Sequence, residues 1–137
     1  VVAVAADIGI DAVLIEEMIT GTIAELLVGV TRDAAHGYVL TLGAGGVLTE
    51  ILRDTVSLLL PVQPTDIELA LNKLNCAPVL AGYRGKPAVH MAAIVEAVLA
   101  VQSYVLANAE TVSEVEINPL LCTPDRAVAV DALIRKA

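Results

Sequence analysis

The stretch "EVEINPLLCTPDRAVAVDALI", residues 114–134, decides the fold, because its pattern predicts two strands joined by a turn. "TPDR" is a turn signal, and apolar-rich runs lie on both sides of it. A two-residue turn at Pro124-Asp125 fixes the register and gives one face that is apolar throughout. The opposed pairs on that face are Val115 with Ile134, Ile117 with Ala132, Pro119 with Val130, and Leu121 with Val128.

The other face of this predicted hairpin carries Glu116, Asn118 and Asp131. In the same register Asn118 and Asp131 are direct neighbours, about 5 Å apart at Cβ. An amide oxygen beside a carboxylate suits Mg²⁺, which commonly binds through one or two carboxylates plus substrate phosphates. From the pattern alone, a polar sheet face in contact with water is the preferred interpretation. A slip of one residue would move Asp131 to the other face, and Pro119, which cannot donate a ladder hydrogen bond, could mark a compensating bulge.

Upstream of the hairpin the pattern predicts further strands and several helices. We expect a helix from Thr65, with Glu68 completing a capping box and Asn75 ending it. The connections between the first strands are too short for parallel crossovers, so the sheet should be antiparallel or mixed, with helices on one side, in an α/β (α+β) fold. The expected strands are 12–19, 23–33, 38–46 and 55–62, the last being a strand or a buried extended segment, and the other helices are 46–54 and 91–108.

Composition sets limits on the partners. The chain has 137 residues, which fits one domain over residues 1–137, and only 18% are charged, against roughly 25% in an average domain. We therefore expect another domain or subunit to cover part of the surface. The net charge of −8 argues against nucleic acid or an anionic membrane as a partner. Two widely separated cysteines and no recognisable signal peptide predict a cytoplasmic protein.

Five motifs in order carry a resemblance to a known family. They are "VLIEEMI" at 13–19, "AELLVGVTRD" at 24–33, "GYVLTLGAGGVLTEILRD" at 37–54, "LAGYRGKPAV" at 80–89, and the hairpin itself. Together they resemble the C-terminal part of the ATP-grasp domain in NDP-forming (ADP-forming) acyl-CoA synthetases and in the β subunit of succinyl-CoA synthetase. The resemblance covers residues 12–134 and implies a C-terminal ATP-grasp lobe without its N-terminal lobe.

The resemblance also implies a site and a reaction. Mg²⁺ and ATP or ADP are the expected cofactors, and the reaction is acyl-CoA + ADP + phosphate ⇌ acid + CoA + ATP through a phosphohistidine located elsewhere. The expected partners are the nucleotide, CoA, a small carboxylic acid and a CoA-binding domain or subunit, and an oligomer is left open. No catalytic residue is expected in this chain. The implied metal ligands are Asn118 and Asp131, with Glu116 nearby. The implied nucleotide contacts are Glu16 along the adenine, the hinge backbone from Glu17 through Met18, and Glu25 at the ribose.

Some residues depart from the family pattern and keep other functions open. Leu58 stands where the family usually has Arg, and His90 where it usually has Asp. One alternative is therefore a degenerate regulatory or scaffold region fused to an acetyltransferase, and another is a lobe that binds nothing alone. "GAGG" at 43–46 fits a tight strand-to-helix turn or amides that touch a phosphate. His36 and His90 are expected to be surface or packing residues, and Arg84 is the loop cation of most interest.

Overall fold

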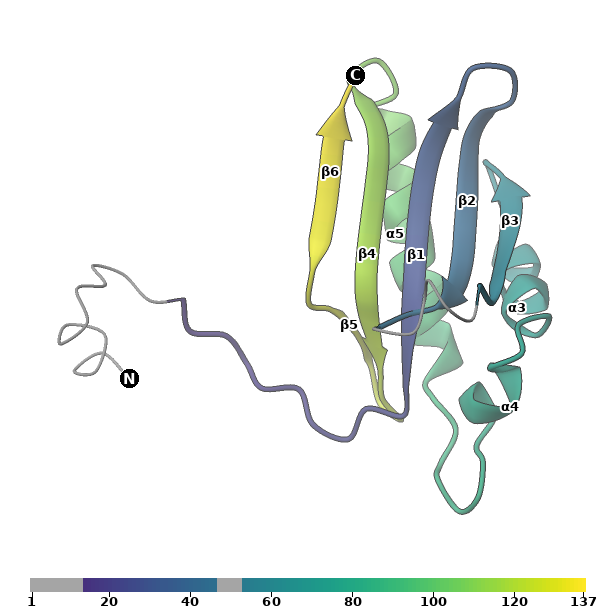
Figure 1. The fold of residues 1–137 in the computed structure, drawn as a ribbon, viewed down its shortest axis with the longest axis vertical. Coiled ribbons are helices and arrows are strands. Elements are labelled where there is room, and N and C mark those ends of the chain that lie inside the picture. The colour runs from purple at the N-terminus through teal and green to yellow at the C-terminus, as the bar shows by residue number, and fades with distance from the viewer. Residues whose placement is uncertain (1–13, 47–52) are drawn as a thin grey trace, which may run out of the picture.

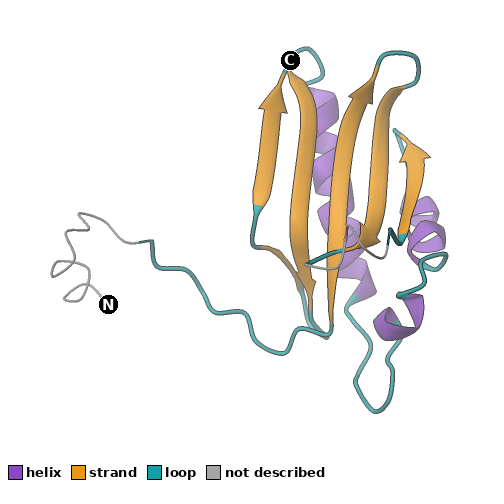
Figure 2. Cartoon of the chain, viewed as in Figure 1, coloured by secondary structure: helices purple, strands orange, loops and turns teal. Residues whose placement is uncertain are grey.

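A computed structural model of the chain describes residues 14–46 and 53–137. Its sheet has the strand order β3-β2-β1-β4-β5, with β6 also paired to β4, and every pair is antiparallel. The helices all lie on one side of this sheet (Figures 1 and 2). The elements are β1 (Ala24–Asp33), β2 (Gly37–Ala44), β3 (Thr55–Leu59), α3 (Pro64–Leu71), α4 (Ala77–Leu80), α5 (Met91–Ala107), β4 (Val112–Cys122), β5 (Ala127–Ala129) and β6 (Ala132–Lys136).

The core lies between the sheet and the helices and is built from aliphatic side chains. In β1 the residues Leu26, Val28 and Val30 alternate with exposed or half-buried ones, which is the pattern of a strand with one covered face. Helix α5 presents the apolar stripe that its sequence predicts, including Ile94 and Val98, both fully buried. The predicted fold class is therefore confirmed: a mainly antiparallel sheet with helices packed on one face.

The hairpin has the predicted register along its whole length. Glu116 pairs with Leu133 on one side of the polar pair, and Leu120 pairs with Ala129 on the other. Between them the amide of Asn118 donates to the carbonyl oxygen of Asp131 at 3.3 Å. Asn118 and Asp131 are therefore opposite each other, as predicted.

The prediction of a single apolar face along the hairpin was wrong in its lower half. Val115 and Ile117 are buried, but further along it is Leu120 and Cys122 that are buried, while Leu121 is only half-buried. The cause is an irregularity in the β1–β4 pairing, in which two residues of β4 occupy the space opposite one of β1. Such a bulge shifts the alternation of side chains by one residue.

Two other expectations need correction. The N-cap of α3 is Gln63, and the side chain of Asp66 accepts from its amide at 2.8 Å, so the capping box is not the one expected at Thr65. Pro64, which has no amide hydrogen, fits the first turn and sets the start earlier. The helix also ends before Asn75, at a C-cap on Asn72.

The strand expected at 12–19 is not formed by its described part. Residues 14–22, which we call the hinge segment, pair with no described strand, and Figure 1 shows them running away from the sheet. An extended chain with no neighbouring strand leaves its backbone groups to water, so the apolar pattern alone does not make a strand. The expected helix at 46–54 falls mostly on residues 47–52, outside the described part. No described helix is long and apolar enough to cross a bilayer.

Candidate functional site

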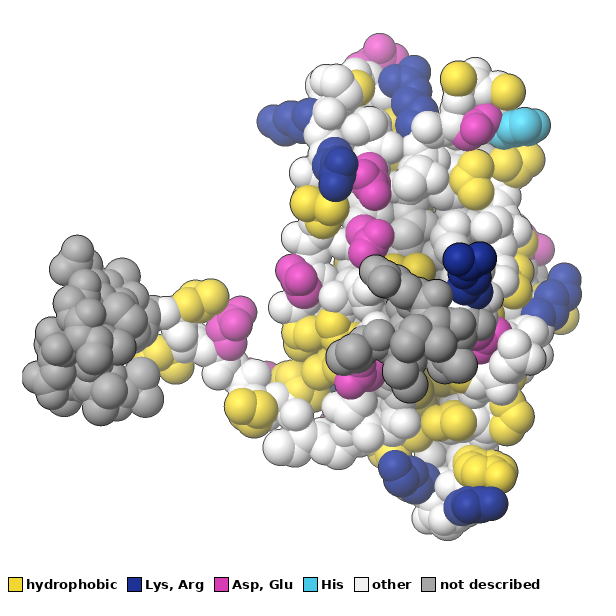
Figure 3. Space-filling view, in the orientation of Figure 1, with side chains coloured by type: hydrophobic (Ala, Val, Ile, Leu, Met, Phe, Trp, Pro, Cys, Tyr) yellow, Lys and Arg dark blue, Asp and Glu magenta, His cyan; other side chains and the backbone are white. Residues whose placement is uncertain are grey.

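The predicted metal ligands and Glu25 lie on the sheet face that α3 and α5 leave uncovered, which we call the open face. The pairing of the strands arranges them in rows. Figure 3 shows acidic side chains along the part of this face over β4. Asn118 lies at the bulge, opposite Asp131. Above the bulge the rows are Gly29 with Glu116 and Leu133, and Thr31 with Glu114 and Arg135. Below it Glu25 lies in a row with Leu121 and Val128.

The chain leaving β2 crosses over β1 on the open face. The amide of Gly45 donates to the carbonyl oxygen of Glu25 at 2.8 Å, and a Cβ at Gly45 would lie 2.6 Å from the backbone of Leu26. Only glycine allows this close approach of two backbones. The next amide, that of Gly46, donates to Oδ1 of Asn118 at 3.1 Å. Gly45 and Gly46, which we call the crossing, therefore join the lower end of β1 to Asn118 on the hairpin.

Gly46 itself needs the conformational freedom of glycine. Its φ is +78°, and a Cβ there would collide with the carboxylate of Glu25. This agrees with the expectation of a tight turn at "GAGG". It also places the Gly46 amide, the Asn118 amide oxygen and the Glu25 carboxylate in one small region.

Few side-chain oxygens on the open face are placed to bind a cation. Asn118 and Asp131 are opposed across the hairpin, and Glu116 lies two residues before Asn118, on the open face. Asp131 is exposed to solvent. Within the described residues, no three His, Cys, Asp or Glu side chains come close enough to hold a metal ion. An amide oxygen with one or two carboxylates fits Mg²⁺, which commonly takes its other ligands from phosphates and water.

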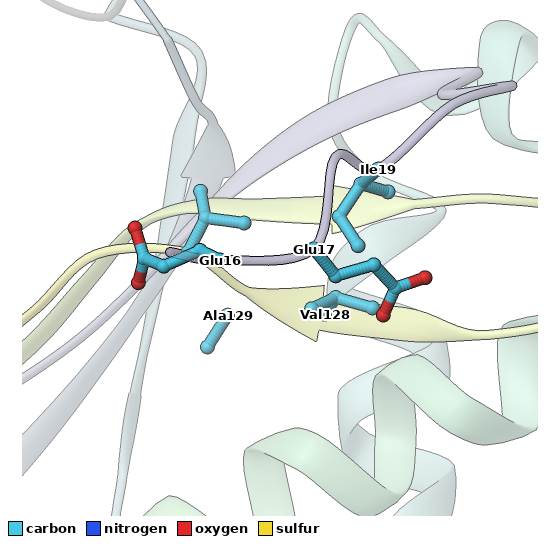
Figure 4. A pocket seen from close by; sticks show the side chains of 6 residues that line it. Glu16, Glu17, Ile19, Val128 and Ala129 are labelled. Atoms are coloured by element: carbon cyan, nitrogen blue, oxygen red, sulfur yellow. The ribbon is translucent and has the colours of Figure 1, made fainter. Parts of the chain in front are cut away.

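The hinge segment and β5 enclose a pocket of about 210 Å³, which we call the hinge pocket. Figure 4 shows Glu16 and Glu17 projecting in different directions from the hinge segment above Val128 and Ala129. Met18, also predicted as a nucleotide contact through its backbone, has an 83% exposed side chain. Glu25 belongs to the crossing rather than to this pocket. The lining residues are Glu16, Glu17, Ile19, Val128, Ala129 and Val130.

Arg126 forms an ion pair with Glu17 that the sequence did not predict. Its guanidinium donates to both carboxylate oxygens of Glu17, at 2.5 and 3.3 Å. The pair lowers the pKa of Glu17 and raises that of Arg126. The two residues are 109 positions apart, and no spacing rule connects them.

The remaining histidines and Arg84 make local contacts. The ring nitrogen Nδ1 of His90 accepts from the amide of Ala93 at 3.1 Å, so this histidine caps α5 as an Asp could. His36 contacts the carboxylate of Asp33 in the β1–β2 turn. Arg84 lies over the ring of Tyr83, 5.3 Å from its centre.

Leu58 is half-buried and packs against the core, because its partner in the β2–β3 ladder is the buried Leu40. It therefore lies on the helix-covered face rather than on the open face.

Comparison with known proteins then decides the family. The ATP-grasp domain family matches residues 1–135. This chain belongs to the ATP-grasp family. Among curated proteins the ATP-grasp chain is 36% identical over 130 residues to a trans-feruloyl-CoA synthase from an unknown prokaryote, covering 93% of the chain and 18% of that protein. It is 33% identical over 108 residues to the β subunit of ADP-forming acetate–CoA ligase I from Pyrococcus furiosus, covering 79% of the chain and 46% of that protein.

Solved structures agree with the ATP-grasp assignment. A dinucleotide-forming acetyl-coenzyme A synthetase 1 from Candidatus Korarchaeum cryptofilum superposes with a TM-score of 0.79 at 30% identity. The match covers 83% of this chain and 53% of that one. That structure contains coenzyme A and Mg-AMPPCP, with its phosphohistidine segment pointing towards the nucleotide-binding site. The present ATP-grasp chain thus spans about half, or less, of the length of these relatives.

Proposed function

We propose that this chain is the C-terminal, nucleotide- and magnesium-binding lobe of an NDP-forming acyl-CoA synthetase. One observation carries the proposal: Asn118 and Asp131 are opposed on the open face, and the Gly46 amide contacts Asn118. The relatives that bind a magnesium nucleotide, or that are ADP-forming ligases, support the same assignment. Glu116 is the further metal-side carboxylate in this proposal, one row above.

The residues of this lobe would act by binding and positioning. Asn118 and Asp131 would supply oxygen ligands for Mg²⁺, and a bound Mg²⁺ would neutralise charge on the nucleotide phosphates. The Gly46 amide donates to Oδ1 of Asn118 and would hold that oxygen in position for the metal ion. Glu25, beside the crossing, is the proposed ribose contact. Phosphoryl transfer depends mainly on positioning and charge neutralisation, which is what such groups provide.

The hinge pocket is the proposed position of the nucleotide base. Glu16 and Glu17 line one side, and Val128, Ala129 and Val130 line the other, so a flat ring could lie between an apolar wall and polar backbone. The hinge backbone through Met18 would contact the base edge. Asp131 directly follows Val130, so the proposed base and metal sites adjoin.

The activity of the whole protein follows from its relatives and is part of this proposal. We infer the reaction acyl-CoA + ADP + phosphate ⇌ acid + CoA + ATP, with the phosphohistidine and the CoA-binding unit outside this chain, in a larger protein or a second subunit. The exposed apolar residues Leu14, Ile15 and Met18 on the hinge segment favour a covering lobe. Cys76 and Cys122 are free thiols, which favours a cytoplasmic location.

A degenerate regulatory role is less well supported. The departure that suggested it, Leu58, lies on the helix-covered face. Having Leu58 at this position, where the family usually has Arg, therefore does not remove a polar side chain from the open face.

The test is calorimetric titration of Mg-ADP into the full protein that carries this chain. Replacing Asp131 with Asn should weaken binding more than tenfold, while Glu96→Gln, on the exposed side of α5, should leave it unchanged. Equal affinities for the folded Asp131→Asn variant and the wild type would remove Asp131 from the site. No detectable binding of Mg-ADP by the wild type would overturn the nucleotide-binding function.

A further inference from the structure

The hinge segment is weakly attached to the rest of the described structure. Its residues form no backbone ladder with a described strand, and the first such bond comes after it, from the amide of Ile23 to the carbonyl oxygen of Cys122 at 2.9 Å. The side chains of Leu14, Ile15 and Met18 are 77–83% exposed. Something else must hold this segment beside β5 if the hinge pocket is to keep its shape.

Arg126 is well placed to do so because its own backbone is held firmly. Thr123, only 2% exposed, makes a closed set of bonds across the turn. Its amide donates to the carbonyl oxygen of Arg126 at 2.9 Å, and its Oγ1 accepts from the amide of Arg126 at 3.1 Å. The carbonyl oxygen of Thr123 accepts from the amide of His90 at the start of α5, at 2.9 Å. The turn is thereby tied to the helix layer.

The contact itself is bidentate. Nη1 and Nη2 of Arg126 each donate to a different carboxylate oxygen of Glu17. This fork geometry restricts both distance and orientation, which a single contact from lysine would not do. Among the described residues it is the polar contact that holds the hinge segment beside the body of the lobe.

We propose that the Arg126–Glu17 ion pair is a latch that fixes the hinge wall of the hinge pocket against β5, which makes Arg126 a positioning residue for nucleotide binding. The inference rests on the proposed function, because it assigns the hinge pocket to the base. Arg126 does not line the pocket, so its effect is transmitted through Glu17. The pair thus connects the turn of the hairpin to the wall of the base site.

The latch acts on binding and not on the chemical step. The two side chains are 44% and 64% exposed, and exposed ion pairs contribute little, which corresponds to about a two- to five-fold change in affinity. Loss of the latch should raise Kd and KM for ADP by that factor and leave kcat unchanged. The effect should shrink at high salt, because solvent ions screen an exposed pair.

The experiment uses the full protein with Mg-ADP as the ligand. Arg126→Gln, Glu17→Gln, the double variant, and the charge exchange Arg126→Glu with Glu17→Arg are compared with the wild type in calorimetry and steady-state kinetics. Arg135→Gln is the control, since Arg135 forms another Arg–Glu ion pair, with Glu114 at 3.0 Å, away from the hinge pocket. It should leave the affinity unchanged.

The latch predicts that the double variant is no weaker than Arg126→Gln alone, and that the charge exchange recovers part of the lost affinity. Additive losses, or an unchanged Kd for Arg126→Gln, would overturn it. A wild type that does not bind Mg-ADP would instead overturn the proposed function. If the wild type binds Mg-ADP, and Asp131→Asn weakens this binding while Arg126→Gln leaves it unchanged, the latch alone is overturned.

Discussion

The crossing of β1 by Gly45 gives the sharpest prediction about how the site is built. Replacing Gly45 with Ala adds one methyl group at a place where the backbone conformation itself permits alanine, since Gly45 is not among the residues of positive φ. The added Cβ would lie 2.6 Å from the carbonyl carbon of Leu26 and 2.7 Å from its oxygen. Leu26 belongs to β1, which is paired on both sides, so its backbone cannot withdraw.

The size of the effect follows from these distances. Carbon atoms in contact prefer about 3.5–4.0 Å, so the crossing must rise by roughly 1 Å. That movement weakens the bonds from Gly45 to Glu25 and from Gly46 to Asn118, of 2.8 and 3.1 Å, and each such bond contributes about 0.5–1.5 kcal/mol. Overpacking by one methyl group has a similar range of about 1–3 kcal/mol. We expect Gly45→Ala to destabilise the lobe by about 2 kcal/mol, which lowers Tm by roughly 4–8 °C.

The assay measures the Tm of the full protein by differential scanning calorimetry. The affinity of the folded variant for Mg-ADP is measured by calorimetric titration. Gly29→Ala is the control, because Gly29 lies in β1, the strand that Gly45 crosses, and its added Cβ would meet nothing nearer than 4.0 Å. It should change stability by less than about 0.5 kcal/mol or increase it slightly. A Gly45→Ala variant as stable as Gly29→Ala, with unchanged nucleotide affinity, would refute the crossing.

Three further predictions concern groups away from the crossing. The buried carboxylate of Asp54 accepts three hydrogen bonds from Asn75 and Cys76, so Asp54→Ala should lower the free energy of unfolding by about 2–4 kcal/mol in denaturant titration. Burial raises the pKa of Cys76 to about 11 and that of Cys122 to about 12, so both thiols should resist iodoacetamide at about pH 8 until the protein unfolds, as mass spectrometry can show. The pKa of Glu17 is lowered from 4.5 by Arg126, so the contribution of Arg126 to Mg-ADP affinity should be constant at neutral pH. It should be lost only as pH falls through that lowered pKa, and a loss between about pH 6 and 8 would contradict the ion pair.

The hairpin could be predicted because strand pairing has a strict geometry. Once the turn is placed, every opposed pair follows, and so the juxtaposition of Asn118 and Asp131 needed no structure. The face of each side chain was less secure, because a bulge shifts the alternation and depends on the neighbouring strand β1. Periodicity within one strand carries no information about that neighbour, which is why Leu121 was placed on the wrong face.

The strand prediction for the hinge segment was wrong, and the crossing was not predicted, for a different reason. The apolar residues of the hinge segment do predict a strand, but a strand forms only beside a partner, and the described residues offer none. The glycines of "GAGG" predict a tight turn, yet nothing in their spacing says that the chain passes over Leu26 and reaches Asn118. Arg126 and Glu17 meet only because the turn of the hairpin and the hinge segment come to the same end of the sheet.

The charges on the open face decide what that face can hold. Glu25, Glu114, Glu116 and Asp131 lie on it, and among the described residues of those rows Arg135 is the cation, already paired with Glu114. Phosphates placed against such a surface are repelled unless a cation lies between them and the carboxylates. Asn118 and the Gly46 amide are the uncharged groups beside Asp131, and in the proposed site Asn118 and Asp131 would hold the Mg²⁺ that offsets this negative charge. We therefore expect the proposed nucleotide to bind this acidic face as its magnesium complex.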